Sequence, residues 1–139
     1  MGKAAPSPAV AVILGSDSDL EVMKGGLDLL DELGLAHELR ILSAHRTPAE
    51  VAEYVGGLAE RGVRVVIAAA GLSAALPGVA AAHTVLPVIG VPIAAGTLGG
   101  LDALLSISQM PPGVPVAAVT IGSPGARNAA LLAARIVAL

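Results

Sequence analysis

The sequence has no cysteine, phenylalanine or tryptophan, and Tyr54 is its one aromatic residue. Without cysteine there is no disulfide, thiolate zinc site or cysteine nucleophile, which fits a cytoplasmic protein. Proteins that bind single-stranded nucleic acids stack bases on aromatic rings, so a single tyrosine argues against a nucleic-acid partner. The formal net charge of -3 points the same way, because it disfavours binding to a phosphate backbone.

Charged residues are scarce in the second half of the chain. The sequence has 19 of them, 16 in the first 64 residues, and none lies between Arg64 and Asp102. A membrane-spanning helix needs about 20 continuous apolar residues, but glycines and prolines interrupt this stretch, so we expect buried strands and short helices and no membrane partner. Residues 1–8 hold one lysine and no apolar core, so no secretory signal is expected. A 139-residue monomer would not comfortably bury so many apolar residues, which predicts a homo-oligomer.

Short apolar runs alternate with helix-like segments along the whole chain. A capping box at Ser18 and Glu21 predicts one helix before Gly34, and an N-cap at Thr47 predicts a second before Gly62. The alternation predicts a single α/β domain, residues 1–139, with a central parallel sheet and helices on both faces. The expected strands are 9–14, 37–42, 63–69, 87–91 and 116–121, and the later helices are 76–83, 101–108 and 126–139.

Ligands of such sheets bind beyond the carboxyl ends of the strands, near the switch in strand order. The loops to consider are 15–19, 43–46, 70–78, 94–100 and 122–128. The first, GSDSD, places hydroxyls and carboxylates at a helix N-terminus, where free N–H groups favour a phosphate. Plain capping of the helix explains the same residues equally well.

The second and third loops carry different chemistry. In SAHRTP, Arg46 can hold a phosphate and His45 can transfer protons near neutral pH, although a surface His–Arg pair is the simpler reading. The third, AAAGLSAALPG, lets a backbone approach a ligand and excludes water, or else serves tight helix-to-sheet packing. It lacks the lysine of a phosphate-binding Walker loop, and the scattered histidines predict no metal site.

Several segments together resemble one enzyme family. The segments that carry the resemblance are GSDSDLEVM, SAHRTP, and ALPG followed by LPVIGVP, LGGLDALLSISQMPPGVPVA and NAALLAARI. In these segments the chain resembles the N5-carboxyaminoimidazole ribonucleotide mutases of purine biosynthesis. The resemblance implies a three-layer, flavodoxin-like (Rossmann-like) sandwich, assembly as a homo-octamer, and no metal or organic cofactor. Chains of this family commonly continue for about one further helix that packs on a neighbouring subunit, whereas the sequence given ends at Leu139.

The resemblance also implies a reaction and a set of site residues. A carboxyl group would move from the exocyclic nitrogen of N5-carboxyaminoimidazole ribonucleotide to ring carbon C4, through CO2 held in a closed pocket. Ser16 and Asp19 of the first loop, with Ser43 and Arg46 of the second, would hold the ribonucleotide. His45 would donate and remove the protons. The expected CO2 cage consists of small and apolar residues of the third loop: Gly71, Ser73, Ala74 and Leu76.

One loop departs from the family pattern. The mutase motif commonly reads GGAAHLPG, whereas this chain has GLSAALPG, so Ala75 replaces a histidine. A sister group of carboxylases (lyases) uses free CO2 directly and carries Gly-Arg-Ser-Asn there, of which Gly71 and Ser73 are shared. Direct carboxylation is therefore the second hypothesis, and a non-catalytic nucleotide-binding module is the third. SAHRTP and QMPPGVPVA favour the mutase.

Overall fold

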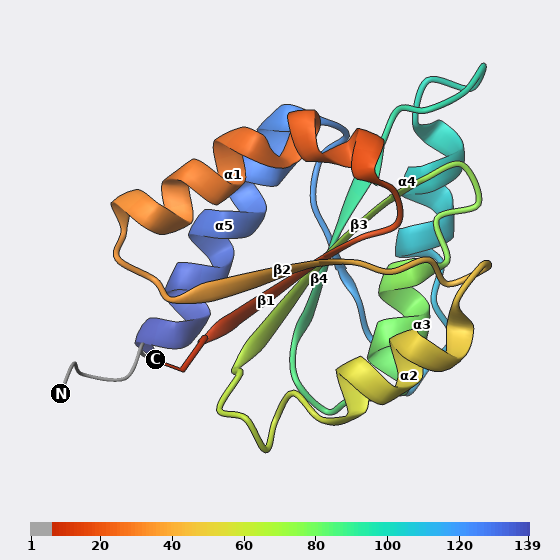
Figure 1. Ribbon diagram of the computed structural model, residues 1–139. Helices are drawn as coiled ribbons and strands as arrows, with labels where there is room; N and C mark the ends of the chain where they lie inside the picture. Colours follow the sequence, from red (N-terminus) through yellow and green to blue (C-terminus); the bar gives the residue numbers. More distant parts are fainter. Residues whose placement is uncertain (1–6) are drawn as a thin grey trace, which may run out of the picture.

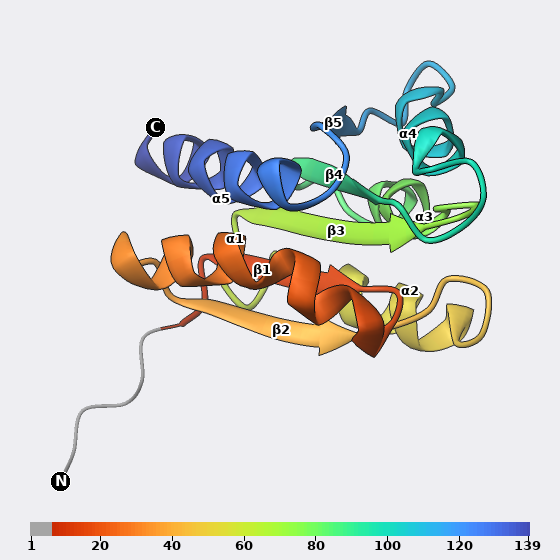
Figure 2. The same cartoon turned by 90° about the horizontal axis from the view of Figure 1, so that it is seen from above.

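The computed structural model describes residues 7–139, whose strands form one five-stranded sheet (Figure 1). All neighbouring strands are parallel, in the order β2-β1-β3-β4-β5 (Figure 2). This flavodoxin-like order confirms the predicted fold class. Residues 1–6, which include most of the segment expected to lack a secretory signal, lie outside the described residues. The strands are β1 (Val10–Leu14), β2 (His37–Ile41), β3 (Val65–Gly71), β4 (Val88–Ile93) and β5 (Ala117–Ala118).

Helices cover both faces of the sheet (Figure 1). Alternate strand residues face opposite layers: Val12 and Ile67 pack toward α1 and α5, whereas Ile13 and Ala68 pack toward the other helices. Coverage on both sides explains why the central strands read as continuous apolar runs. Across residues 7–139, no helix combines the length and the apolar character needed to cross a membrane. The helices are α1 (Leu20–Glu32), α2 (Pro48–Gly56), α3 (Leu76–Ala82), α4 (Leu101–Ser108) and α5 (Ser123–Ala138), with a 3-10 turn, η1 (Asp17–Asp19), before α1.

The two helices of the α1–α5 layer lie side by side (Figures 1 and 2). Gly26 of α1 sits against the backbone of Ala126 in α5. A Cβ atom built on Gly26 would lie 2.5 Å from the Ala126 carbonyl oxygen and 2.9 Å from the carbonyl carbon. Glycine at position 26 is therefore what allows the two backbones to approach this closely.

Several predicted boundaries are wrong. β3 starts at Val65 instead of residue 63, and β4 extends to Ile93. The strand expected at 116–121 is only two residues long, since Ala117 and Ala118 alone pair with β4. The last helix begins at Ser123, three residues before the predicted start, because Pro124 is accepted in a first helical turn. The capping box expected at Ser18 does not form, since the chain makes the η1 turn before α1 begins.

Candidate functional site

A pocket of about 500 Å3 lies at the carboxyl ends of β1, β2 and β3. From β1 the chain moves to one side of the sheet, and from β3 it moves to the other, so the pocket occupies the switch point. The loops after these three strands form most of its wall, and Ala95, after β4, completes it. The structure brings all nine predicted site residues together in this pocket: Ser16, Asp19, Ser43, His45, Arg46, Gly71, Ser73, Ala74 and Leu76.

The first loop supplies hydroxyl groups and a buried carboxylate. The Ser16 Oγ accepts a hydrogen bond from the Ser18 backbone N–H at 3.3 Å and lies 2.9 Å from the Ser18 hydroxyl. Asp19 is 5% exposed, and burial raises the pKa of its carboxyl group, although a backbone hydrogen bond at Ser16 acts in the opposite direction. A carboxylate in this position can accept hydrogen bonds from the hydroxyl groups of a sugar.

The second loop places His45 and Arg46 at its exposed tip. The Ser43 Oγ accepts a hydrogen bond from the Arg46 backbone N–H at 3.1 Å. Thr47 is the N-cap residue of α2, as predicted, but its hydroxyl makes no capping hydrogen bond to that helix. It bonds to the backbone of Ser43 instead. His45 and Arg46 therefore both line the pocket, and the turn that carries them is fixed at its base.

The third loop forms an apolar wall. Ala74 and Leu76 are each 2% exposed. A Cβ atom on Gly71 would lie 2.7 Å from the Ala95 Cβ, so glycine is needed for the loops after β3 and β4 to meet. Leu72 has a φ of 56°, the one positive value among the non-glycine residues of 7–139, and its side chain is exposed beside the pocket. Small and apolar groups here can exclude water from a bound ligand.

Some pocket residues were missed by the sequence prediction. Ala95 belongs to the 94–100 loop, which was among those considered, whereas the 122–128 loop does not line the pocket. Ala75, the position where the related motif has histidine, lies in the wall. Among residues 7–139 no three histidine or acidic side chains gather as a metal site would require. The other residues that line the pocket are Gly15, Ser18, Ala44, Ala70 and Leu72.

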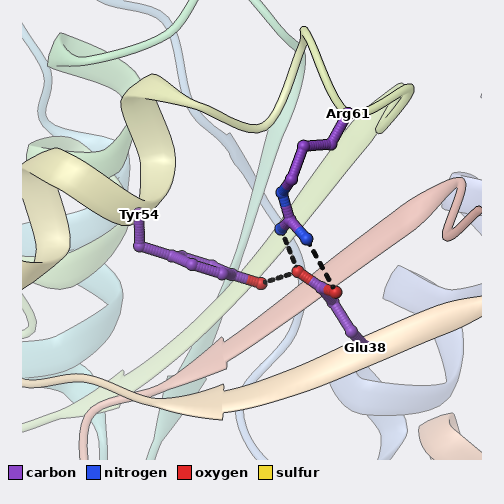
Figure 3. Close-up of polar contacts among 3 residues, drawn as sticks. All are labelled: Glu38, Tyr54 and Arg61. Carbon is purple, nitrogen blue, oxygen red and sulfur yellow. Dashed lines mark hydrogen bonds and ion pairs between the residues drawn. The ribbon is translucent and has the colours of Figure 1, made fainter.

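Outside the pocket, three polar side chains connect β2 to α2 and to the turn that follows it (Figure 3). The Tyr54 hydroxyl donates to Glu38 Oε1 at 2.6 Å, and Arg61 pairs with both oxygens of the same carboxylate. The Arg40 guanidinium stacks 4.7 Å from the centre of the Tyr54 ring. Hydrogen bonds from Arg61 and Tyr54 lower the pKa of Glu38, whereas burial, and then Glu38, raises the pKa of Tyr54. This Glu38–Tyr54–Arg61 cluster fastens the two elements that flank the second loop.

Comparison with known proteins places the chain among related sequences and folds. The sequence model of the AIR carboxylase family matches residues 9–139. The N5-carboxyaminoimidazole ribonucleotide mutase of Bacillus subtilis is 55% identical over 130 residues, covering 94% of this chain and 80% of its own. The mutase of Mycobacterium tuberculosis is 56% identical over 137 residues, covering 99% and 78%. The crystal structure of Treponema denticola PurE superposes with a TM-score of 0.81 at 31% identity, covering 94% of this chain and 80% of that one.

Proposed function

The chain belongs to the AIR carboxylase family, and from this membership we infer that it is an N5-carboxyaminoimidazole ribonucleotide mutase, an enzyme of purine biosynthesis. It converts N5-carboxyaminoimidazole ribonucleotide into 4-carboxy-5-aminoimidazole ribonucleotide. Relatives about 55% identical over nearly the whole chain bear the mutase name. The structural observation that carries the inference is the pocket. Residues of three separate loops, to which the family resemblance assigns roles in this reaction, line the same cavity.

The first two loops bind the ribonucleotide. Arg46 is exposed and offers a planar set of donors that suits a phosphate. The hydroxyls of Ser16 and Ser43 add neutral hydrogen bonds nearby. Asp19 accepts hydrogen bonds from the ribose, and its burial makes such bonds stronger than they would be in water.

His45 moves the protons of the reaction. The bond between the exocyclic nitrogen and the carboxyl carbon breaks, the nitrogen takes a proton from the His45 imidazolium, and CO2 is released into the pocket. C4 then attacks CO2, and the proton that C4 loses returns to the His45 imidazole. Protons and electrons balance within the substrate and this one side chain, so the proposed reaction calls for no cofactor.

The third loop retains CO2 between the two steps. Gly71, Ser73, Ala74 and Leu76 form a small, largely apolar wall that keeps CO2 beside its target and raises its effective concentration. Ala75 in this wall supplies no imidazole, so proton transfer depends on His45.

The decisive assay compares two substrates. With N5-carboxyaminoimidazole ribonucleotide and no added bicarbonate, the enzyme should form the C4 carboxylate. If it turns over only aminoimidazole ribonucleotide, and only with added CO2, the protein is instead a direct carboxylase. If it binds the product nucleotide but turns over neither substrate, it is a non-catalytic binding module.

A matched pair of histidine variants tests the proton-transfer role. His45→Asn should abolish turnover while product binding persists, because Asn keeps a polar side chain but cannot carry the proton. His83→Asn, at the exposed C-cap of α3, should leave turnover unchanged. Full activity of His45→Asn would contradict the assigned role.

We further propose that the enzyme works in the cytoplasm as a homo-octamer. Leu98, Leu101 and Leu105, in and just before α4, are each at least 50% exposed, which supports contacts between subunits. Light scattering at micromolar concentration should give a mass several times that of one chain, and a monomeric mass would exclude the assembly.

A further inference from the structure

Thr47 does not perform the task that its position suggests. A threonine at an N-cap usually accepts a hydrogen bond from an N–H group in the first turn of its helix. The Thr47 hydroxyl makes no such bond to α2. It accepts from the Ser43 N–H at 3.2 Å and donates to the Ser43 carbonyl oxygen at 3.1 Å, while the Thr47 N–H donates to the same carbonyl at 2.9 Å.

These bonds close the second loop at its base. Both backbone polar groups of Ser43 bond to Thr47, and the Ser43 side chain in turn accepts the Arg46 N–H at 3.1 Å. The residues enclosed by this ring are Ala44, His45 and Arg46. The Thr47 hydroxyl contributes two of the bonds that hold this backbone, and within residues 7–139 it is the one group that bonds to both the N–H and the carbonyl of Ser43.

The tip of the loop has little else to orient it. The side chains of His45 and Arg46 are exposed, and within the described part of the chain neither makes a hydrogen bond to another residue. Their direction thus depends on the backbone of the turn that carries them. Thr47 itself is half-buried and is absent from the pocket wall.

We propose that Thr47 is the positioning residue of the active site: its hydroxyl closes the 43–47 turn and so aims His45 and Arg46 into the pocket. The inference rests on the proposed function, since it assigns those two residues their tasks. Small displacements of reacting groups lower rates steeply, so a loosened turn should affect catalysis more than folding.

Two substitutions at this position separate the hydroxyl from the shape of the side chain. Thr47→Val keeps the shape and removes both hydroxyl bonds, so kcat/KM for N5-carboxyaminoimidazole ribonucleotide should fall by about 10- to 100-fold. We expect kcat to fall because His45 is misplaced and KM to rise because Arg46 is. Thr47→Ser keeps the hydroxyl and should remain within about 3-fold of the wild type.

Thr84→Val is the matched control. The Thr84 hydroxyl oxygen is also half-buried and accepts a local backbone bond, from the Leu86 N–H at 3.1 Å, in a loop that does not line the pocket. Its loss should reduce stability without changing kcat or KM. If Thr47→Val fails to fold, Thr47→Ala carries the same comparison.

A second readout does not depend on the substrate. The ring signals of His45 in an NMR spectrum, assigned with His45→Asn, should shift or broaden in Thr47→Val and stay as in the wild type in Thr47→Ser and Thr84→Val. Failure of the wild type to act on either ribonucleotide would refute the proposed function, whereas the NMR comparison would still test the turn. Unchanged His45 signals in folded Thr47→Val, or kinetics within about 3-fold of the wild type, would overturn the role of Thr47.

Discussion

Two adjacent glycines in α1 should respond in opposite ways to the same substitution. Gly25 and Gly26 both lie inside the helix, where alanine is favoured over glycine by about 1 kcal/mol. A Cβ atom on Gly25 would meet the Arg127 side chain at 3.4 Å, which is an ordinary contact with a flexible group. A Cβ atom on Gly26 would meet the Ala126 backbone at 2.5 Å, and a backbone cannot move aside without moving its helix.

The sizes of the two effects follow from these contacts. Gly25→Ala should raise the free energy of unfolding by about 1 kcal/mol, because it gains helix propensity at little steric cost. Overpacking a core costs about 1–3 kcal/mol, and the clash at Gly26 falls at the upper end because it separates α1 from α5. After the propensity gain is subtracted, Gly26→Ala should lower the free energy of unfolding by about 2 kcal/mol.

Urea unfolding followed by far-ultraviolet circular dichroism measures both variants against the wild type. All samples need the same protomer concentration, because assembly of the folded state would shift the unfolding midpoint. The difference between the variants, about 3 kcal/mol, well exceeds the uncertainty of comparing midpoints. Equal midpoints for Gly25→Ala and Gly26→Ala would refute the close approach of α1 and α5.

Three further substitutions test other features of the structure. Leu72→Gly should raise the free energy of unfolding by about 0.5–1 kcal/mol. The left-handed backbone costs leucine about 1–2 kcal/mol, and the greater freedom of glycine in the unfolded chain offsets part of the gain from removing this strain. A lower urea midpoint would contradict the strain. The Arg61 hydrogen bonds lower the pKa of Glu38, so its stabilising effect should be present above the ordinary pKa of 4.5 and be lost as the pH falls through the lower pKa of the folded state. In Glu38→Gln the free energy of unfolding should therefore fall less steeply at acid pH than in the wild type. An unchanged acid dependence would argue against the ion pair. Burial raises the pKa of Asp19, so its ionised form destabilises the fold above that pKa. Asp19→Asn should therefore unfold at a higher urea concentration than the wild type at pH 7, but it should bind the product nucleotide more weakly. A loss of stability would show that hydrogen bonds to the ionised carboxylate outweigh the cost of its burial.

The alternation of strands and helices predicted the layers and placed five candidate loops at one end of a parallel sheet. The family resemblance singled out the three loops that form most of the pocket wall. Neither predicted contacts that depend on strand order. Ala95 joins the pocket because β4 lies beside β3, and Glu38 meets Arg61 across 23 residues of chain. The short β5 was overestimated because an apolar run does not reveal how many residues find a pairing partner.

Local sequence patterns predicted where a helix begins more reliably than which hydrogen bonds its first residues make. The pattern at Thr47 correctly marked the start of α2, yet the hydroxyl bonds to Ser43, since a threonine can satisfy either the helix or the turn before it. Likewise, the chain forms a 3-10 turn capped by Ser16 instead of the capping box expected at Ser18. Such choices between nearby partners depend on the geometry of the loop, which residue types alone do not fix.

The three walls of the pocket belong to separate strand–helix units, and this makes the site modular. A change in the loop after β3 alters the apolar wall, while the loops after β1 and β2, which we propose bind the ribonucleotide, keep their own supporting strands. Residues 72–75, where this chain reads LSAA, can therefore be exchanged by grafting, while Gly71, which the close approach to Ala95 requires, is kept. With the roles proposed for the three loops, such a scaffold allows the handling of carbon dioxide to diverge while the residues that bind the ribonucleotide stay the same.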